Sequence, residues 1–216
     1  MSLAFGRPNR VMPGPSQSPD RVLNAMHREA PNIYEGELIS LTDTIRRDLC
    51  ALADTTGELA IYIANGHGAW EASLSNIISP GDHVLVPRSG HFSDGWAEMA
   101  AALGARVDTI DAGANRPFDP EAVARALEDD TDHLIKAVLA VQVDTSTSVR
   151  SDIQALGRAM SRTGHPALLM VDAIACFACD RFEMDAWGVD VMVTASQKGL
   201  MCPPGLGFVF FNDRAA

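Results

Sequence analysis

The sequence predicts an α/β domain built on a mostly parallel seven-stranded sheet with flanking helices. Seven short runs rich in β-branched and apolar residues recur along the chain, and segments with helical spacing lie between several of them. Several runs are apolar almost throughout, which is typical of strands covered on both faces. At 216 residues the chain is long enough for one such domain with a sizeable core, or for two small ones at most.

The predicted strands leave room for helices between them. They lie at residues 60–64, 83–87, 106–110, 134–143, 167–172, 189–194 and 207–211. Apolar residues at helical spacing predict two helices, with the faces Trp70, Leu74, Ile77 and Ile78, and Trp96, Ala100 and Leu103. Asp119 and Pro120 provide a capping side chain and a first-turn proline for a third helix. Strands that alternate with helices in this way favour a parallel sheet.

Residues 1–60 differ from the rest of the chain. We predict that they form an N-terminal arm and helix, and that residues 61–216 form the large ligand-binding domain. The arm is rich in proline and glycine between residues 7 and 20, and a helical segment follows at residues 20–28. We expect this extension to wrap around the sheet domain.

The composition favours a globular protein that binds small molecules. The formal net charge is -11 and the chain has no block of Lys or Arg residues, which argues against a nucleic-acid or anionic-membrane partner. The apolar runs are too short to span a bilayer. The start of the chain has no apolar run of signal-peptide length, so we expect a cytoplasmic location.

The chain has four cysteines, and Cys176 and Cys179 form a C-x-x-C pair. Such a pair could bind a metal ion or cycle as a dithiol. A zinc site needs a second pair of ligands at matching spacing, and the sequence offers none. We therefore interpret the pair as buried small apolar residues and predict no metal site.

Ligands of open α/β sheets collect at the carboxyl ends of the strands, so the residues that follow each strand are candidates for function. Gly66 and Gly68 follow the first predicted strand, and we expect a helix to begin near Ala69. Glycines before a helix let backbone N–H groups approach an anion such as phosphate. The alternative is an ordinary tight turn, which two glycines also favour.

Two charged residues follow other predicted strands. Asp172 ends the run at residues 167–172, and Lys198 lies in a turn after the run at residues 189–194. A carboxylate at the end of a buried strand needs a partner, and a helix cap or an ion pair is the alternative to a functional role. A partly desolvated lysine can form a Schiff base. A phosphate site, a carboxylate and an amine together match the phosphate, ring nitrogen and aldehyde of pyridoxal phosphate.

Four segments of the sequence resemble the class V, fold-type I pyridoxal-phosphate aminotransferases, most of all the serine–glyoxylate and alanine–glyoxylate enzymes. They are "NGHGAWEASLSNIISPGD", "HLIKAVLAVQVDTSTSV", "GHPALLMVDAIA" and "MDAWGVDVMVTASQKGLMCPPGLGFV". The resemblance runs from about Pro13 to the last residue, and its most specific part is the S-Q-K-G-L-x-x-P-P-G string that contains Lys198. It implies pyridoxal 5'-phosphate as the cofactor and a homodimer as the assembly.

The resemblance also implies catalytic roles. Lys198 would form the Schiff base with the cofactor and, once released, would move a proton between the substrate Cα and the cofactor C4′. Asp172 would keep the cofactor's pyridine nitrogen protonated. Trp70 would stack on the cofactor ring, with plain core packing as the alternative.

The remaining implied roles concern binding. His67 and Gly68 would bind the cofactor phosphate, assisted by Gln197. A role as an ordinary turn residue is the alternative for His67. Thr145 would donate its hydroxyl to the phenolic oxygen of the cofactor, and Gly14 with the two residues after it would line the substrate pocket.

The sequence departs from the family pattern in three places. Where relatives often have E-[ST]-x-T-G, this chain has Asp144 as a shorter acid and Ser148 in place of glycine, so the loop geometry there is open. The segment around Asn32 and Tyr34 also differs, and these two residues are candidates for altered choice of amino donor. The chain stops soon after the seventh strand, without the small C-terminal domain and its substrate-binding arginine, so we expect a fragment.

We therefore predict transamination from serine, alanine or aspartate to glyoxylate or a similar 2-oxo acid. One alternative is other class V chemistry such as cysteine desulfuration, which needs a reactive cysteine on a mobile loop. Cys202 lies near Lys198 but beside two prolines, which makes its surroundings stiff. A second alternative is a non-catalytic phosphate-binding module that uses only the turn with Gly66 and Gly68.

Overall fold

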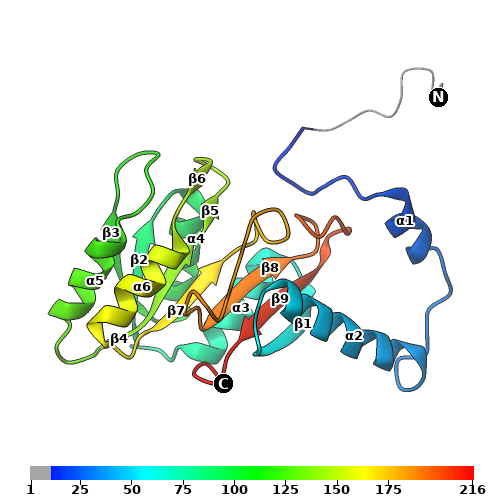
Figure 1. Ribbon diagram of the computed structural model, residues 1–216, viewed down its shortest axis with the longest axis horizontal. Helices are drawn as coiled ribbons and strands as arrows, with labels where there is room; N and C mark the ends of the chain where they lie inside the picture. Colours follow the sequence, from blue (N-terminus) through cyan, green and yellow to red (C-terminus); the bar gives the residue numbers. More distant parts are fainter. Residues whose placement is uncertain (1–10) are drawn as a thin grey trace.

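The computed structural model describes residues 11–216 and contains a seven-stranded sheet with the order β1-β9-β8-β7-β4-β2-β3 (Figure 1). The strands are β1 (Glu58–Ala64), β2 (His83–Arg88), β3 (Arg106–Asp111), β4 (Ile135–Val141), β7 (Leu168–Asp172), β8 (Val191–Ala195) and β9 (Gly205–Phe211). Within this sheet β9 runs antiparallel to both of its neighbours, β1 and β8, and the other pairs are parallel. The predicted fold class is confirmed, and each predicted run overlaps one strand of this sheet.

The longest predicted run, residues 134–143, breaks before its end. β4 stops at Val141, and the buried Gln142 donates its backbone N–H to the carbonyl oxygen of Asp172 at 3.0 Å. The chain then forms a short hairpin of β5 (Val143–Asp144) and β6 (Val149–Arg150), which the sequence did not lead us to expect. The hairpin brings residues 144–148 over the carboxyl end of the sheet.

Helices cover both faces of the sheet (Figure 1). On one face, α5 (Pro120–Asp129) and α6 (Ile153–Thr163) bury Val123, Leu127, Ile153 and Leu156 in one core cluster. On the other face, α3 (Gly66–Ile77) and α4 (His91–Ala102) bury Trp70, Leu74, Trp96 and Ala100 in a second cluster. Strands β7 and β8 are buried along their whole length between these layers, which explains why their sequences are apolar throughout.

The helix boundaries follow their capping residues. Asp119 accepts a hydrogen bond from the backbone N–H of Glu121 at 3.0 Å, as its position before Pro120 predicts. The Asn65 side chain accepts from the N–H of Gly68 at 3.1 Å, so α3 begins at Gly66 and not near Ala69 as expected. This earlier start decides which backbone N–H groups of the first turn have no hydrogen-bond acceptor within the helix.

The N-terminal region holds α1 (Asp20–Met26) and α2 (Glu37–Leu52), and neither helix has a buried residue. In Figure 1 the segment with α1 lies away from the sheet, and α2 lies beside β1. The extension contacts the sheet domain at two places, through residues 13–16 at the turn after β8 and through α2 at β1, and the expectation that it wraps the domain stays a prediction. Its residues 1–10 lie outside the described residues, and the expected boundary at residue 60, which falls within β1, stays a prediction.

Candidate active site

A cavity of about 250 Å³ lies at the carboxyl ends of the central strands. It is lined by Asn65, Gly66, His67, Trp70, Phe92, Val143, Thr145, Asp172, Ile174, Ala175, Gln197 and Lys198. These residues come from the end of β1 and the start of α3, the ends of β7 and β8, the start of α4 and the β5–β6 hairpin. Seven of the residues singled out in the sequence lie here together: Gly66, His67, Trp70, Thr145, Asp172, Gln197 and Lys198.

The first turn of α3 forms one end of the cavity. Asn65 uses its side chain to accept from Gly68, and its carbonyl oxygen accepts from Ala69 at 3.0 Å. Within residues 11–216, no hydrogen bond is formed by the backbone N–H groups of Gly66 and His67, although both residues line the cavity. Free N–H groups at a helix N-terminus form a site for an anion such as phosphate.

Gly68 has a different role from the expected one. Its N–H is already donated to Asn65, and it does not line the cavity. A Cβ atom at this position would lie 2.6 Å from the Cβ of Ala64, so the glycine lets α3 pack closely against the end of β1. The donors at the cavity come from Gly66 and His67 because the helix begins earlier than the sequence suggested.

Asp172, the last residue of β7, lies at the other side of the cavity and is 3% exposed. Its Oδ2 accepts a hydrogen bond from the indole N–H of Trp70 at 2.9 Å, and its Oδ1 accepts from the backbone N–H of Ile174 at 2.7 Å. Burial raises the pKa of Asp172 to about 7, although both hydrogen bonds and the charge of Lys198 act in the opposite direction. The carboxyl can therefore hold or release a proton near neutral pH.

Trp70 is fixed on both sides. Its ring stacks on Trp96 with a centroid distance of 5.9 Å, and His67 lies edge-on to it at 4.8 Å. The indole is almost fully buried and still lines the cavity. The ring thus packs in the core and also forms part of the cavity wall, and its stacking on a cofactor stays a prediction.

Lys198 lies in the turn after β8, close to the N-terminal arm. Its Nζ donates to the carbonyl oxygen of Pro13 at 3.1 Å. The arm is held at this turn by Ser16, which donates its backbone N–H to the Gln197 carbonyl and its hydroxyl to the Lys198 carbonyl, both at 2.7 Å. A Cβ at Gly14 would lie 2.7 Å from the Lys198 Nζ, so the arm passes this close only because residue 14 is glycine.

The side chain of Gln197 in the cavity wall has an atom without a hydrogen-bond partner among the described residues. The buried Oε1 of Gln197 forms no hydrogen bond with the described residues. Oxygen and nitrogen of an amide are assigned from the contacts they make, so either atom of the side chain can face the cavity. Together with the free N–H groups of α3, Asp172 and Lys198, this group fits a ligand with a phosphate, a protonated ring nitrogen and an aldehyde.

The remaining predicted residues lie elsewhere. Tyr34 is 85% exposed in the connection between α1 and α2, next to Asn32, and the structure does not bring either residue to the cavity of its own chain. Ser148, which stands where relatives often have glycine, has a φ of +58°, a conformation that favours glycine. Thr145 still lines the cavity despite this departure.

Sequence reasoning missed five lining residues: Asn65, Phe92, Val143, Ile174 and Ala175. Asn65 could have been found as an N-cap, and Ile174 as a neighbour of Asp172. Phe92 carries no signal, because an aromatic residue in the first turn of a helix is usually part of the core.

The cysteines are all free, and Cys176 is buried whereas Cys179 is exposed. The expected burial therefore holds for one member of the C-x-x-C pair only. No group of three or more His, Cys, Asp and Glu side chains among residues 11–216 is arranged to hold a metal ion. Cys202 is tied into the turn by its backbone N–H, which donates to the Ser196 carbonyl at 3.0 Å. In the same part of the chain, no helix is both long enough and apolar enough to cross a membrane.

Comparisons with known proteins identify the family of the chain. Residues 10–216 match the family described as Aminotransferase class-V. The chain is 38% identical over 211 residues to the serine–glyoxylate aminotransferase of Methylorubrum extorquens, a match that covers 97% of this chain and 52% of that protein. It is 35% identical over 210 residues to the L-aspartate–glyoxylate aminotransferase of Paracoccus denitrificans, which covers 94% of this chain and 52% of that protein.

A solved structure shows the same likeness in three dimensions. The alanine–glyoxylate aminotransferase from Nostoc sp. has a TM-score of 0.88 and 31% sequence identity, over 100% of this chain and 56% of that chain. The chain therefore spans about half the length of the curated relatives that it matches.

Proposed function

The chain belongs to the class V aminotransferase family, and from that premise we propose that it forms the cofactor-binding part of an aminotransferase. The proposed reaction moves an amino group from serine, alanine or aspartate to glyoxylate or a similar 2-oxo acid, with pyridoxal 5'-phosphate as the cofactor. The observation that carries the proposal is the presence of Lys198, Asp172 and the free N–H groups of Gly66 and His67 around one cavity.

The protein contributes an amine, an acid and a rigid wall. Pyridoxal phosphate, when bound, supplies a ring that withdraws electrons from the substrate carbon next to the amine. Lys198 would provide the Nζ that holds the cofactor and, once released, would carry a proton to and from the substrate Cα. Asp172 would hold a proton on the ring nitrogen, which its raised pKa would let it share near neutral pH.

Binding residues surround these two groups. We assign the phosphate to the N–H groups of Gly66 and His67, with the Gln197 side chain as a further donor. Trp70 orients Asp172 through its indole N–H and offers its ring to the cofactor. Thr145 donates its hydroxyl to the phenolic oxygen of the cofactor. Each of these side chains also excludes water from the site.

Fewer residues of this chain can be assigned to the substrate pocket than to the cofactor site. Gly14 contacts Lys198 and remains our candidate for its wall. Tyr34 is far from the cavity of its own chain, so a substrate role requires the cavity of a second subunit. We propose a homodimer, and the exposed apolar residues Leu41, Ile45 and Leu52 of α2 support it. We further propose a cytoplasmic location, on the basis of the sequence alone.

The test uses the full-length protein and the matched variant Lys198→Ala. Borohydride treatment of the wild-type protein with pyridoxal phosphate should leave the cofactor on the peptide that contains Lys198, as mass spectrometry would detect, and the variant should carry none. A panel of amino donors with glyoxylate as the acceptor then measures the reaction. Labelling without activity towards any donor would refute the aminotransferase assignment and keep the cofactor assignment.

Two outcomes favour the alternatives. Sulfide release from cysteine in the same assay would assign desulfuration instead of transamination. Absence of labelling at Lys198, together with retained phosphate binding, would favour a non-catalytic phosphate-binding module.

A further inference from the structure

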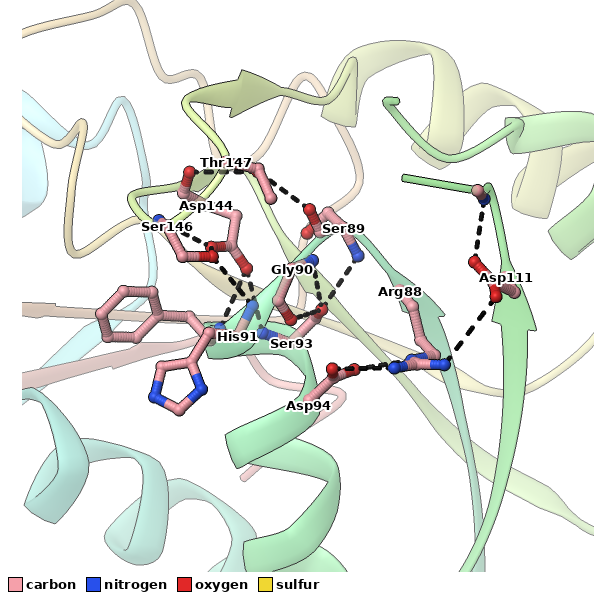
Figure 2. Close-up of polar contacts among 12 residues, drawn as sticks. Arg88, Ser89, Gly90, His91, Ser93, Asp94, Asp111, Asp144, Ser146 and Thr147 are labelled. Atoms are coloured by element: carbon pink, nitrogen blue, oxygen red, sulfur yellow. Dashed lines mark hydrogen bonds and ion pairs between the residues drawn. The ribbon is translucent and has the colours of Figure 1, made fainter. Parts of the chain in front are cut away.

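The polar contacts between the start of α4 and the hairpin loop centre on one carboxyl group (Figure 2). Asp144, the last residue of β5, has no exposed surface. Its Oδ2 accepts hydrogen bonds from the backbone N–H groups of Phe92 at 3.0 Å and Ser93 at 3.3 Å. Its Oδ1 accepts from the backbone N–H of Ser146 at 3.0 Å and from the Ser146 hydroxyl at 2.6 Å. One side chain thus joins two segments that are 52 residues apart in sequence.

Further contacts fix the same junction. The backbone N–H of His91 donates to Ser146 Oγ at 2.9 Å, and the Thr147 hydroxyl donates to the Ser89 carbonyl oxygen at 2.9 Å (Figure 2). A Cβ atom at Gly90 would lie 2.7 Å from Asp144 Cγ, so the backbone approaches the carboxyl as closely as a glycine permits. The start of α4 and residues 144–147 are therefore packed as one unit.

Residues on both sides of this junction reach the cavity. Phe92 lines the cavity and is held through its own N–H by Asp144. Thr145 lines the cavity too, and it lies between Asp144 and Ser146, which bond to each other. Asp144 itself does not line the cavity. Its hydrogen bonds therefore influence the shape of the cavity through Phe92 and Thr145.

We propose that Asp144 is a positioning residue for pyridoxal phosphate, whose carboxyl fixes the Thr145 hydroxyl and the Phe92 ring in the cavity wall. The inference rests on the proposed function, because Thr145 acts on the cofactor only if this cavity binds it. Asp144 also lies near enough to Asp172 to help raise the pKa of that group, although burial of Asp172 is the larger cause. A carboxylate at a helix N-terminus stabilises the helix in any case, so the test must separate positioning from helix capping.

Asp94 provides a matched control because it lies in the same first turn of α4. Its carboxyl accepts hydrogen bonds from the Arg88 guanidinium at 2.6 Å and 2.8 Å, and among the described residues these are its only side-chain hydrogen bonds. The change Asp94→Asn therefore weakens the same helix end without releasing the loop that carries Thr145. Like Asp144→Asn, it replaces a carboxyl group by an amide.

The experiment measures the binding of pyridoxal phosphate to the cofactor-free full-length protein by quenching of tryptophan fluorescence. We expect Asp144→Asn to raise the dissociation constant about tenfold and Asp94→Asn to change it by less than about twofold. Both variants should lower the midpoint of urea unfolding. Ser146→Ala keeps the carboxyl and removes one of its anchors, so it should raise the dissociation constant by a smaller factor, and it replaces Asp144→Asn if that variant does not fold.

Equal changes in the dissociation constant for Asp144→Asn and Asp94→Asn would assign Asp144 to helix capping alone and overturn the inference. Unchanged cofactor binding in both Asp144→Asn and Ser146→Ala would also overturn it, while the proposed function would stand. A wild-type protein that binds no pyridoxal phosphate would refute the proposed function first and the role of Asp144 with it.

Discussion

Asp172 gives the folded chain a pH-dependent stability in the absence of cofactor. Burial raises its pKa from 3.8 to about 7, so the folded state binds this proton more tightly than the unfolded state. The stabilisation from protonation is complete below about pH 4 and is lost as the pH rises through about 7. Between pH 5 and pH 8 the free energy of unfolding should fall by about 2 to 3 kcal/mol from this group alone.

Asp172→Asn isolates this contribution. Urea unfolding of the cofactor-free wild type and variant at pH 5 and pH 8 measures the difference in their pH dependence. The variant should lose the fall in stability that comes from this carboxyl and keep whatever other groups contribute. An identical pH dependence in both proteins would mean that the carboxyl is better solvated than its 3% exposure indicates.

The two charged residues that sequence reasoning found lie at or near the ends of strands. Asp172 ends β7 and Lys198 lies in the turn after β8, and because the ends of such apolar runs must meet at one edge of a parallel sheet, their proximity could be expected. Gly68 was misplaced because a shift of three residues in the start of α3 changes which N–H groups are free. Asp144 could not be understood from sequence, since its partners Phe92 and Ser93 are more than fifty positions away.

Helices α4 and α6 each contain an interior glycine, and its replacement by alanine should have opposite effects on stability in the two helices. In α4, a Cβ at Gly95 would lie 3.6 Å from the ring of Trp70, an ordinary contact, so Gly95→Ala should stabilise the helix by about 1 kcal/mol. In α6, a Cβ at Gly157 would overlap the carbonyl oxygen of Trp187. Gly157→Ala should therefore destabilise the chain by about 1 to 3 kcal/mol or more, because α6 must move off its neighbour.

Urea or thermal unfolding of the two variants tests the pair, and each variant serves as the other's control. Helix propensity is the same in both cases, so a difference in sign can come only from packing. If Gly157→Ala were as stable as the wild type, α6 would not lie as close to the segment with Trp187 as the structure places it.

The strands with apolar runs were predicted from the sequence, whereas α6 and the β5–β6 hairpin were not. All seven sheet strands were expected, because buried strands need apolar runs. α6 was missed although Asp152 caps its start and Gly164, with a φ of +67°, ends it, and both signals are visible in the sequence. The β5–β6 hairpin was missed because its strands have only two residues each.

At the scale of the molecule, α2 presents an apolar face that residues 11–216 leave partly exposed. Leu41, Ile45 and Leu52 are spaced by four and seven residues, so they share one side of the helix, and their exposed fractions lie between 38% and 49%. Exposed apolar faces of this kind mark contacts with other chains. We expect the full-length protein to be a dimer and the double variant Leu41→Glu/Ile45→Glu to be largely monomeric in sedimentation velocity.

Leu134→Glu is the control for this change, because Leu134 is 59% exposed in the connection between α5 and β4. It also places a glutamate at an exposed apolar position, one charge instead of two and away from α2, and should leave the sedimentation coefficient unaltered. A double variant that still sediments as a dimer would place the subunit contact on a different surface.

The position of β9 has a consequence for the order in which the fold can form. β1 is joined to the sheet through β9, which lies between it and β8, yet residues 58–64 are made long before residues 205–211. During translation, before β9 has been synthesised, β1 has apolar side chains and unpaired backbone groups but no neighbouring strand. A nascent chain arrested before residue 205 should therefore bind chaperones through β1. A chain that includes residues 205–211 outside the ribosome should no longer bind them there.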